Sequence, residues 1–413
     1  MRILIVGSGG REHAIGWKVK QSQNAGQMFF APGNGGTAEL GTNIDIGANE
    51  IEKLADYVVE HQIDLTIVGP EAPLGLGIAD VFRKRGLKIF GPDKNGAQLE
   101  TSKAFAKSFM EKYGIPTARY EVYTDVRLAA RALENWEYPL VIKADGLAAG
   151  KGVIICETKD SALEAINQIM HKKAFGSSGD TIIIEEFLEG REVSLLCFTD
   201  GITIVPMESA ADYKRALDND EGLNTGGMGS ISPAPYYKDE MGADIAKKTL
   251  QGIQAEGFDY RGVIYIGLMV TDKGSKVIEY NARFGDPEIE ALMLRLNSDL
   301  LDIVSAIERK TLSSLSIDWK PDPAVCVVIT SGGYPGAYEQ GHTITMSSPQ
   351  NNAVVFHSGT SLENGILRTA GGRVFMVCAT GKTMEQSRIS AYENVKKIQF
   401  EKCAYRKDIG LWN

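Results

Sequence analysis

The sequence offers neither a disulfide framework nor a zinc site. Its five cysteines form no C-x-x-C pair and are scattered at Cys156, Cys197, Cys326, Cys378 and Cys403. This pattern is typical of free thiols in a reducing compartment. No apolar run approaches the roughly 18 residues of a membrane span, and the start of the chain lacks the apolar core and cleavage site of a signal peptide. We therefore expect a cytoplasmic protein with no membrane partner.

An excess of positive charge is also missing. The 44 Lys and Arg residues are outnumbered by 53 Asp and Glu residues, which gives a net charge of -9. This balance disfavours a nucleic-acid partner, although a phosphorylated small molecule needs only a local cluster of cations. With 413 residues, of which 43% are hydrophobic, the chain can form several domains with large cores.

Strand-like and glycine-rich segments alternate over the first hundred residues. Four short apolar runs, at residues 2–6, 27–31, 64–68 and 87–90, each lead into a glycine-containing loop, with helical stretches between them. Strand, glycine loop and helix in repetition predict a parallel α/β sheet. A ligand of such a sheet binds where the carboxyl ends of the strands meet.

The first of these loops, residues 7–12 (GSGGRE), is similar to a dinucleotide fingerprint but has Glu12 in place of the third glycine. A partial match of this kind is weak support for a nicotinamide cofactor. A phosphate bound at the N-terminus of the following helix does not require the complete fingerprint. This interpretation is favoured because three such loops meet at one edge of the sheet. The alternative is that the glycines only permit tight turns.

A glycine-rich hairpin is predicted in the middle of the chain. The strand at residues 138–143 ends on Lys143, small residues follow at 144–152, and a second strand spans 153–156. Small residues let backbone N–H groups approach phosphate oxygens, and Lys143 and Lys151 supply charge. We interpret the hairpin as a lid over phosphates, although it lacks the P-loop pattern. The alternative is a mobile surface hairpin.

Two further segments are candidates for binding. The strand at residues 181–184 runs into Glu185 and Glu186, where the backbone could hold an adenine edge and a carboxylate a ribose; an acidic connector is the alternative. Residues 212–230 form a long polar stretch that we expect to be a loop. Long loops in compact enzymes are often functional.

A strand that begins at residue 276 indicates a metal site. Because side chains alternate along a strand, Glu279, Asn281 and Arg283 should share one face. The other face, for packing, should carry Ile278, Tyr280 and Ala282. Carboxylate and amide oxygens suit Mg²⁺ beside substrate phosphates, and a guanidinium suits a phosphate or carboxylate. A solvated strand face followed by an ordinary turn is the alternative.

The last ninety residues predict a small α/β domain. Strands are expected at residues 324–330, 354–356 and 373–379, followed by a helix that begins after Thr383. The polar, proline-containing stretch 313–323 before them is a plausible linker.

The order of these features resembles the ATP-grasp superfamily of carboxylate–amine ligases, and within it the glycinamide ribonucleotide synthetase (phosphoribosylamine–glycine ligase) family. The motifs that carry this resemblance run in order along the whole chain. They are GSGGREH, APGNGGT, DLTIVGPEAPL, KIFGP, SKAF, VIKADGLAAGKGV, NTGGMG, SPAP, NARFGDPE, GGYPG and YRKDIG.

The resemblance implies a fold and a set of domains. It implies an α/β protein with an N-terminal parallel-sheet domain at residues 1–101, an ATP-grasp domain at 102–323 with a lid subdomain at about 120–190, and a C-terminal α/β domain at 324–413. The reaction implied is the ligation of glycine to 5-phosphoribosylamine through glycyl phosphate, with ATP as co-substrate and Mg²⁺ or Mn²⁺ as the metal. The sequence does not give the oligomeric state, and a monomer is the favoured expectation.

The resemblance also assigns roles to residues. Metal binding falls to Glu279 and Asn281. The nucleotide is expected to contact Lys103, Lys143, Gly146, Gly150, Lys151, Gly152, Glu185, Glu186, Phe187, Leu188 and Glu192. The two other substrates are expected to contact Gly9, Gly10, Arg11, Asn34, Glu71, Asp212, Lys214, Asn224, Gly226, Gly227, Arg283 and Asp286. Catalytic roles are expected for Lys143, Lys214 and Arg283, with Arg283 on the acyl phosphate or on the glycine carboxylate.

One departure from the superfamily concerns the metal. Many ATP-grasp enzymes carry a further acidic ligand on the strand before the E-x-N motif, but residues 263–270 contain no acid. Either Glu288 or a water would complete the metal shell, or the metal binds more loosely when the substrates are absent. Three alternatives to the whole interpretation are another ATP-grasp ligase or carboxylase, a nicotinamide-dependent dehydrogenase, and a non-catalytic nucleotide-binding module.

Overall fold

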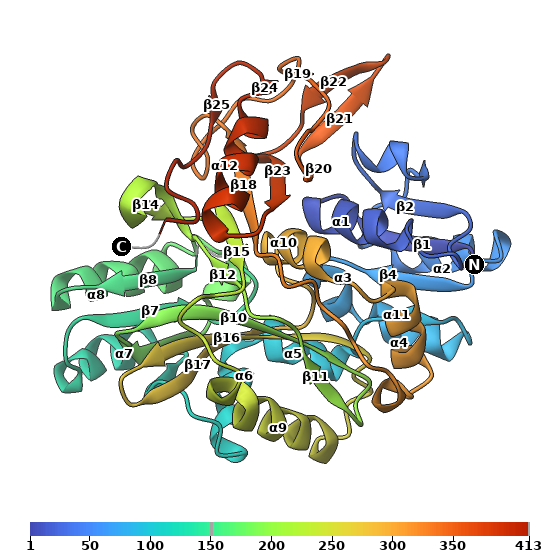
Figure 1. Cartoon of the computed structure of the whole chain (residues 1–413). Coiled ribbons are helices and arrows are strands. Elements are labelled where there is room, and N and C mark those ends of the chain that lie inside the picture. The colour runs from blue at the N-terminus through green and yellow to red at the C-terminus, as the bar shows by residue number, and fades with distance from the viewer. Residues whose placement is uncertain (149–151, 412–413) are drawn as a thin grey trace.

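The computed structural model describes residues 1–148 and 152–411, which form four sheet-based parts around a common centre (Figure 1). Gly150 and Lys151, which the sequence predicts to contact the nucleotide, lie outside the described residues. Within the described chain, no helix has the length and apolar character that crossing a bilayer requires.

The N-terminal part is a parallel sheet, as predicted. Its elements are β1 (Ile3–Gly7), α1 (Gly10–Val19), β2 (Met28–Pro32), β3 (Thr42–Asn43), α2 (Ile51–Glu60), β4 (Leu65–Val68), α3 (Glu71–Leu76), α4 (Ile78–Lys84), β5 (Ile89–Phe90) and α5 (Lys94–Thr101). The strands lie in the order β3-β2-β1-β4-β5, and all pairings are parallel. Every residue of β1 and β4 is buried, which explains why these strands read as continuous apolar runs. The two polar residues of β3 carry no such signal.

The central part is an antiparallel sheet with the order β11-β10-β16-β17. Its elements are α6 (Lys103–Lys112), β10 (Arg191–Thr199), β11 (Ile204–Pro206), α9 (Glu240–Ala255), β16 (Gly262–Thr271), β17 (Gly274–Asn281), α10 (Glu288–Arg295) and α11 (Leu300–Glu308). Helix α6 begins at the predicted cap, because the Ser102 hydroxyl accepts a hydrogen bond from the Phe105 N–H at 3.1 Å. Phe109 of α6 then packs edge-on against Tyr280 of β17, which ties this helix to the sheet.

The lid part has its own sheet and core. Its elements are β6 (Tyr120–Tyr123), α7 (Val126–Ala132), β7 (Leu140–Ala144), β8 (Val153–Cys156), α8 (Lys159–Ile166) and β9 (Ile182–Glu186). The strand order is β6-β9-β7-β8, and β7 pairs antiparallel with β8, so the predicted hairpin is confirmed. A separate apolar cluster that includes Leu133, Leu140 and Ile166 fills the space beneath the sheet.

The C-terminal sheet recruits strands from the middle of the chain. Its order is β12-β15-β18-β23-β20, and the elements of this region are β12 (Ala211–Asp212), β13 (Arg215–Leu217), β14 (Glu221–Asn224), β15 (Gly229–Ser232), β18 (Ala324–Ser331), β19 (Thr345–Met346), β20 (Ala353–His357), β21 (Thr360–Glu363), β22 (Ile366–Thr369), β23 (Arg373–Thr380), α12 (Met384–Val395), β24 (Ile398–Gln399) and β25 (Cys403–Ala404). Strand β15 pairs antiparallel with β18, far away in sequence.

The prediction of one long loop at 212–230 is therefore wrong. The segment contains β13, β14 and β15, and β13 and β14 form a hairpin across a turn in which Asn219 and Asp220 adopt positive φ. Strand β15 (GSIS) was not predicted, because glycine and serine give little apolar signal in the sequence, although all four of its residues are buried. A side chain at Gly229 would collide with the Cys326 carbonyl at 2.6 Å, so the close strand pairing itself requires glycine.

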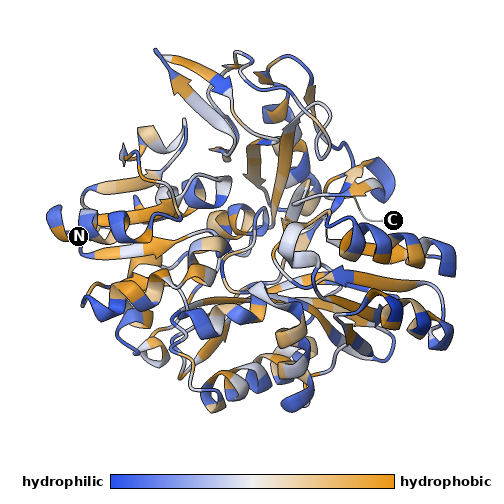
Figure 2. Cartoon of the chain, turned by 180° about the vertical axis from the view of Figure 1, so that it is seen from behind, coloured by the Kyte–Doolittle hydropathy of each residue, from blue (hydrophilic) through white to orange (hydrophobic). Residues whose placement is uncertain are grey.

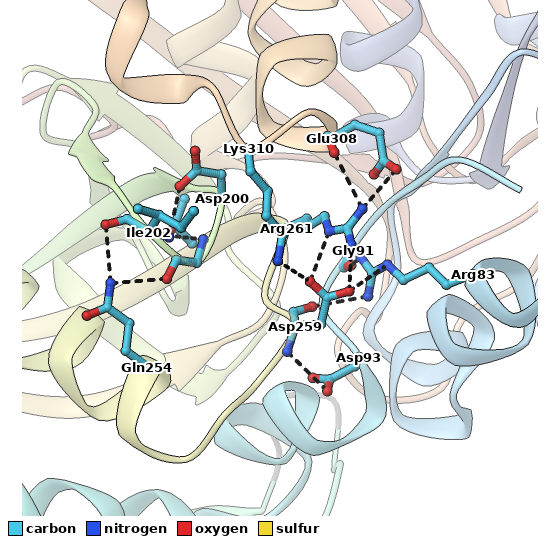
Figure 3. Close-up of polar contacts among 12 residues, drawn as sticks. Arg83, Gly91, Asp93, Asp200, Ile202, Gln254, Asp259, Arg261, Glu308 and Lys310 are labelled. Atoms are coloured by element: carbon cyan, nitrogen blue, oxygen red, sulfur yellow. Dashed lines mark hydrogen bonds and ion pairs between the residues drawn. The ribbon is translucent and has the colours of Figure 1, made fainter. Parts of the chain in front are cut away.

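An ionic cluster joins the N-terminal part to the central part (Figure 3). The Asp259 carboxylate accepts hydrogen bonds from both Nε and an Nη of Arg261, at 2.9 and 2.8 Å, and it pairs with Lys310 at 3.1 Å. Arg83 of α4 reaches the same carboxylate at 3.4 Å and the Gly91 carbonyl at 2.7 Å. These contacts fix the end of β5 against the start of β16, where the Gly91 N–H also bonds the Arg261 carbonyl at 2.7 Å.

The hydropathy of the ribbon follows this layering. In Figure 2 the inner strands of the N-terminal and C-terminal sheets are largely orange, whereas the surrounding helices alternate between orange and blue. The helices therefore turn one apolar side toward the sheets, as expected for amphipathic covering helices.

Candidate functional site

A cavity of about 1100 Å³ lies where the four parts meet. Most of the predicted binding residues line it. They are Arg11, Glu71, Lys103, Lys143, Gly152, Glu185, Glu186, Phe187, Leu188, Glu192, Asp212, Lys214, Asn224, Gly226, Glu279, Asn281, Arg283 and Asp286. One continuous space thus connects the lid sheet with the N-terminal part, so that it can hold the reacting ends of more than one substrate.

Strand β17 places the predicted metal ligands at the middle of this cavity. Glu279 lies opposite Gly267 of β16, whose missing side chain leaves room for it, and a Cβ there would approach the Glu279 Cγ to 3.0 Å. The register shifts at this point, because Leu268 pairs with Val277 and Gly267 pairs with Glu279. The extra residue in this β-bulge is Ile278.

The bulge corrects one detail of the predicted alternation. Tyr280, which also borders the cavity, and Ala282 pack in the core as expected, whereas Ile278 is only half-buried, lies outside the core and lines the cavity. Strict alternation fails here because a bulge inserts one residue into the strand and turns its side chain to the other face. The Ile278 carbonyl also takes part in the site, because it accepts a hydrogen bond from Lys143 Nζ at 3.0 Å.

Cations surround the Glu279 carboxylate. Lys214 Nζ lies 3.5 Å from a Glu279 oxygen and 2.6 Å from a Glu192 oxygen. Burial alone would raise the pKa of Glu279, but Lys214, together with Lys143 and Lys103, holds that pKa below its usual value. The pKa of Lys214 is raised well above its usual value because Glu192 and Glu279 outweigh its burial. Both groups are therefore charged at neutral pH.

The residues present suit a hard divalent cation. The Glu279 carboxylate and the Asn281 amide oxygen stand two residues apart on the cavity side of β17, and the amide oxygen accepts a hydrogen bond from Arg283 at 3.3 Å. Across the described residues, no group of three or more His, Cys, Asp and Glu side chains gathers to hold a metal. Two protein oxygens that leave the remaining positions to substrate phosphates are the usual arrangement for Mg²⁺.

Glu288 faces the same region but is engaged elsewhere. It is 3% exposed, and its carboxylate accepts a hydrogen bond from the Ser194 hydroxyl at 2.8 Å. Together with burial, it raises the pKa of neighbouring Asp212 well above the usual range. Glu288 thus shapes the charge on the Asp212 side, and its part in metal binding stays a prediction.

The end of the cavity nearest the lid sheet, named the nucleotide end because the sequence predicts ATP contacts there, contains two predicted lysines, Lys103 and Lys143, and a third, Lys107, that was not predicted. Lys103 Nζ donates to the Gly146 carbonyl at 2.9 Å, which places the start of α6 against the lid hairpin. Lys143 Nζ lies 3.1 Å from Glu185. Lys107, one helical turn beyond Lys103, contacts the same Glu185 oxygen at 2.9 Å. A lysine in the middle of an amphipathic helix gave no signal in the sequence.

The opposite end contains arginines held by carboxylates. Arg283 contacts Glu100 at 2.9 Å and Glu71 at 3.4 Å, and both acids outweigh burial so that the Arg283 pKa is raised. Burial raises the pKa of Glu100 to about 7, although Arg283 opposes the shift. Glu100 was not predicted, since it lies on a helix without a recognisable motif.

The C-terminal sheet contributes two further residues that the sequence did not reveal. Arg373 of β23 contacts the Asp286 carboxylate at 3.0 Å, and the Tyr334 hydroxyl accepts the Gly226 N–H at 3.0 Å. Both residues line the cavity. Only the motif GGYPG, which contains Tyr334, could have pointed to this contribution.

Several predicted binding residues in the glycine loops of the N-terminal part lie outside the cavity lining. Within the described chain, Gly9, Gly10 and Asn34 of this part do not line the cavity, and neither do Gly146 of the lid hairpin or Gly227 just before β15. The Glu12 carboxylate accepts the Gly9 N–H and a hydrogen bond from Arg11, so the N-terminus of α1 already holds an anion of its own.

Glu12 also explains the incomplete fingerprint. A Cβ at Gly7 or Gly69 would meet the Glu12 side chain at 2.5 or 1.8 Å. The Glu12 carboxylate therefore fills the space between the ends of β1 and β4 where a dinucleotide phosphate would lie. Asn34 is similarly engaged, because its amide donates to the Ser8 and His357 carbonyls at 2.9 Å each.

Comparisons with known proteins agree with this architecture. Models of the phosphoribosylglycinamide synthetase N domain, ATP-grasp (A) domain and C domain match residues 1–100, 101–289 and 324–412. A phosphoribosylamine–glycine ligase of Clostridium acetobutylicum is 46% identical over 414 residues, with 99% of each chain covered.

Solved structures give the same picture. The crystal structure of a phosphoribosylamine–glycine ligase from Thermotoga maritima has a TM-score of 0.87 at 36% identity, covering 99% of this chain and 100% of that chain. A biotin carboxylase domain of Hydrogenobacter thermophilus 2-oxoglutarate carboxylase reaches 0.77 at 14% identity, covering 98% and 91% of the two chains, and so shares the fold alone. The chain belongs to the phosphoribosylglycinamide synthetase family.

Proposed function

We propose that the chain catalyses the ATP-dependent ligation of glycine to 5-phosphoribosylamine, which yields glycinamide ribonucleotide, ADP and phosphate in purine biosynthesis. Family membership over the full length supports this reaction. The observation that carries it is the continuous cavity, in which a lysine-rich end in the central and lid parts opens onto Arg11 and Glu71 of the N-terminal part.

The chemistry proceeds in two steps. A glycine carboxylate oxygen attacks the γ-phosphorus of ATP, the bond to the β-phosphate oxygen breaks, and glycyl phosphate and ADP form. The amine nitrogen of phosphoribosylamine then attacks the carbonyl carbon, phosphate leaves, and the nitrogen loses one proton. The first step is needed because a carboxylate is a poor electrophile, whereas an acyl phosphate has a good leaving group.

Charge stabilisation is the main task of the side chains. Lys103 and Lys143 would bind the ATP phosphates, and Lys214 would stabilise the negative charge of the phosphoryl group that moves onto glycine. Arg283 would hold the acyl phosphate or the glycine carboxylate. Lid closure by the β7–β8 hairpin would exclude water from glycyl phosphate, which hydrolyses easily.

Glu279 and Asn281 would hold Mg²⁺ or Mn²⁺. The metal would neutralise phosphate charge when bound. Lys214 lies 3.5 Å from Glu279 in this structure. Lys214 would stay beside this carboxylate, and Glu279 with Asn281 would hold the metal, whose charge would offset that of the phosphates.

The remaining assignments follow the position of each residue along the cavity. The adenine is assigned to the backbone at residues 186–188 and to the Glu185 side chain, and the ribose to Glu192. Glycine is assigned to Asp212, Asn224 and Gly226. Arg11, Glu71 and Asp286 are assigned to phosphoribosylamine. We further propose that the enzyme is monomeric and cytoplasmic. Its acidic net charge supports the absence of nucleic-acid partners.

The direct test is ADP release with MgATP and glycine, with and without phosphoribosylamine formed in situ from ribose 5-phosphate and ammonia. We expect turnover to require glycine and the amine together, with glycinamide ribonucleotide as the product. ADP release that needs neither co-substrate would contradict the proposal and favour another ATP-grasp ligase or an uncoupled ATPase.

A further inference from the structure

Lys107 is a buried lysine beneath the nucleotide end of the cavity. It belongs to α6, it is 2% exposed, and it lines the cavity beside the residues assigned to the adenine. Nothing in the two-step chemistry uses it. A lysine so deeply buried needs specific partners to offset the loss of water.

The contacts of Lys107 hold its ammonium group against one oxygen of Glu185. Its Nζ lies 2.9 Å from Glu185 Oε2, donates to the Thr117 hydroxyl at 2.8 Å, and stands 5.5 Å from the centre of the Tyr120 ring. The Thr117 hydroxyl in turn donates to the Val277 carbonyl at 2.7 Å, so the chain of contacts ends on the backbone of β17. Lys107 therefore connects α6, the start of β6 and the central sheet to a single carboxylate oxygen.

The two oxygens of Glu185 are used unequally. Oε2 takes both lysines, Lys107 at 2.9 Å and Lys143 at 3.1 Å. Oε1 is buried and has no hydrogen-bond partner among the described residues, although Glu185 lines the cavity and is 2% exposed. A buried carboxylate oxygen without a partner is costly, and it becomes favourable when a ligand donates to it.

The ligand that fits this oxygen is an N–H donor on the edge of a purine. Apolar side chains, among them Val141, Ile155 and Met269, line the same end of the cavity and suit the faces of a base. Adenine presents an amino group at its six-position, whereas guanine presents a carbonyl oxygen there. The carboxylate accepts from the first and repels the second.

We propose that Lys107 is a positioning residue that holds Glu185 Oε2 so that Oε1 receives the adenine amino group, and that it thereby sets the preference of the enzyme for ATP over GTP. The proposal rests on the ligase function above and deepens it at the nucleotide end. Lys143 alone would not suffice for this role, because it also donates to the Ile278 carbonyl and is the lysine assigned above to the ATP phosphates.

The charge of the cluster agrees with this role. Burial lowers the pKa of Lys107 to about 8, with Glu185 opposing the shift, so the ammonium stays mostly protonated at neutral pH. The Lys107 and Lys143 ammonium groups both lie on Glu185 Oε2, and a carboxylate without a proton can only accept hydrogen bonds. A neutral residue at position 107 would remove one of the two positive charges that hold Glu185 Oε2.

The test compares Lys107→Met with Lys107→Arg and with Lys112→Met as the matched control. Lys112 is in the same helix but exposed, where it pairs with Glu256 at the surface. For each variant, KM for ATP, KM for glycine, kcat and the ratio of kcat/KM for ATP over GTP are measured, and the fold is checked by thermal melting. Equilibrium binding of ATP and of GTP without the other substrates is measured alongside.

We expect Lys107→Met to raise KM for ATP and to lower the ATP-over-GTP ratio, each by about tenfold or more, because the site loses its orientation toward a hydrogen-bond donor. KM for glycine should stay unchanged, Lys107→Arg should restore part of the ratio, and Lys112→Met should resemble the wild type. An unchanged ATP-over-GTP ratio in folded Lys107→Met, or an equal loss for both nucleotides, would overturn the proposal.

Two further measurements keep the proposal testable in every case. If Lys107→Met does not fold, Glu185→Gln replaces it, since an amide can both donate and accept; an ATP-over-GTP ratio that stays unchanged in this variant would overturn the proposal. Binding measured without co-substrates separates this proposal from the ligase function, because nucleotide preference would persist even if the enzyme used another amine.

Discussion

The two ends of the cavity hold their cations in opposite ways. At the nucleotide end, Lys103 donates to a backbone carbonyl, and one carboxylate, Glu185, is the shared ionic partner of Lys107 and Lys143. At the other end each arginine has carboxylate partners of its own. These pairs are Arg11 with Glu12, Arg283 with Glu71 and Glu100, and Arg373 with Asp286.

This difference indicates what each end can bind. The lysine end keeps positive charge available, which suits the polyanionic phosphates of a nucleotide. The arginine end is balanced, so it suits groups that bring charges of both signs, such as an amino acid or an amine close to a phosphate. The arginine end also draws its residues from three parts of the fold, whereas the lysine end is built from the central and lid parts alone.

The largest effect is expected at the border of the two ends, from Glu279→Gln. The substitution keeps the shape but removes the charge that Lys214 faces and that a metal would use. A loss of several kcal/mol of charge stabilisation corresponds to about 10²–10³-fold in kcat, measured as ADP release. Asp244→Asn, an exposed carboxylate on α9, is the control. Turnover of Glu279→Gln within about threefold of the wild type would refute the metal assignment.

The arginine end can be broken by Arg283→Met. Removing the cation leaves Glu100 buried and unpaired, so the free energy of unfolding should fall by about 3 kcal/mol, and kcat should fall about 100-fold. Urea unfolding and ADP release report the two effects. The double variant Arg283→Met/Glu100→Gln should regain stability but not activity. If it regained activity as well, Arg283 would have a structural role only.

A buried histidine pair joins the N-terminal part to the C-terminal sheet behind the arginine end. The Nδ1 of His13 accepts the His357 backbone N–H at 2.8 Å, and both side chains are buried. Burial lowers the pKa of His13 to about 3 and that of His357 to about 4. Both rings are therefore neutral in the folded protein at neutral pH.

Acid should weaken this joint. The unfolded histidines gain protons below pH about 6.5 while the folded ones do not, so the stabilisation is complete above that pH and is lost as the pH falls toward 4. Each histidine adds a slope of about 1.4 kcal/mol per pH unit to the free energy of unfolding in this window. His13→Gln should reduce the slope, and His171→Gln, an exposed control, should not. Equal slopes in wild type and His13→Gln would contradict the assignment.

The smallest effect is expected at the ionic cluster of Figure 3, far from both ends. Asp259→Asn weakens contacts with Arg83, Arg261 and Lys310, which are all partly exposed. We expect a loss of about 1 kcal/mol in the free energy of unfolding, seen as a lower melting temperature, with KM for ATP and glycine unchanged. A large change in either KM would show that this joint controls the geometry of the cavity.

The sequence predicted those parts of the fold and of the cavity in which a regular pattern of apolar residues or side-chain alternation places charged or polar residues. The apolar runs gave the parallel sheet, and the lysine at the end of β7 gave the lid hairpin. Alternation along a strand predicted that Glu279 and Asn281 lie on one face, and both line the cavity. The same alternation placed Ile278 on the wrong face, because the sequence does not reveal the β-bulge at that residue.

The residues that were missed have tertiary rather than local causes. Lys107 and Glu100 are charged residues in ordinary helices, and only the packing of three segments around them makes them special. Arg373 and Tyr334 reach the cavity because the C-terminal sheet extends through β15 toward it. Asn34 was assigned to a substrate from the family resemblance alone, and in the structure its amide donates to backbone carbonyls.

The shared C-terminal sheet has a consequence for synthesis. Strand β15 emerges from the ribosome about ninety residues before β18, its hydrogen-bonded neighbour. Until then, its free edge and the cavity wall that it supports stay incomplete, and exposed strand edges favour aggregation. A nascent chain that stops short of residue 324 therefore holds the nucleotide lysines but an incomplete cavity wall, which a strand made about ninety residues after β15 completes.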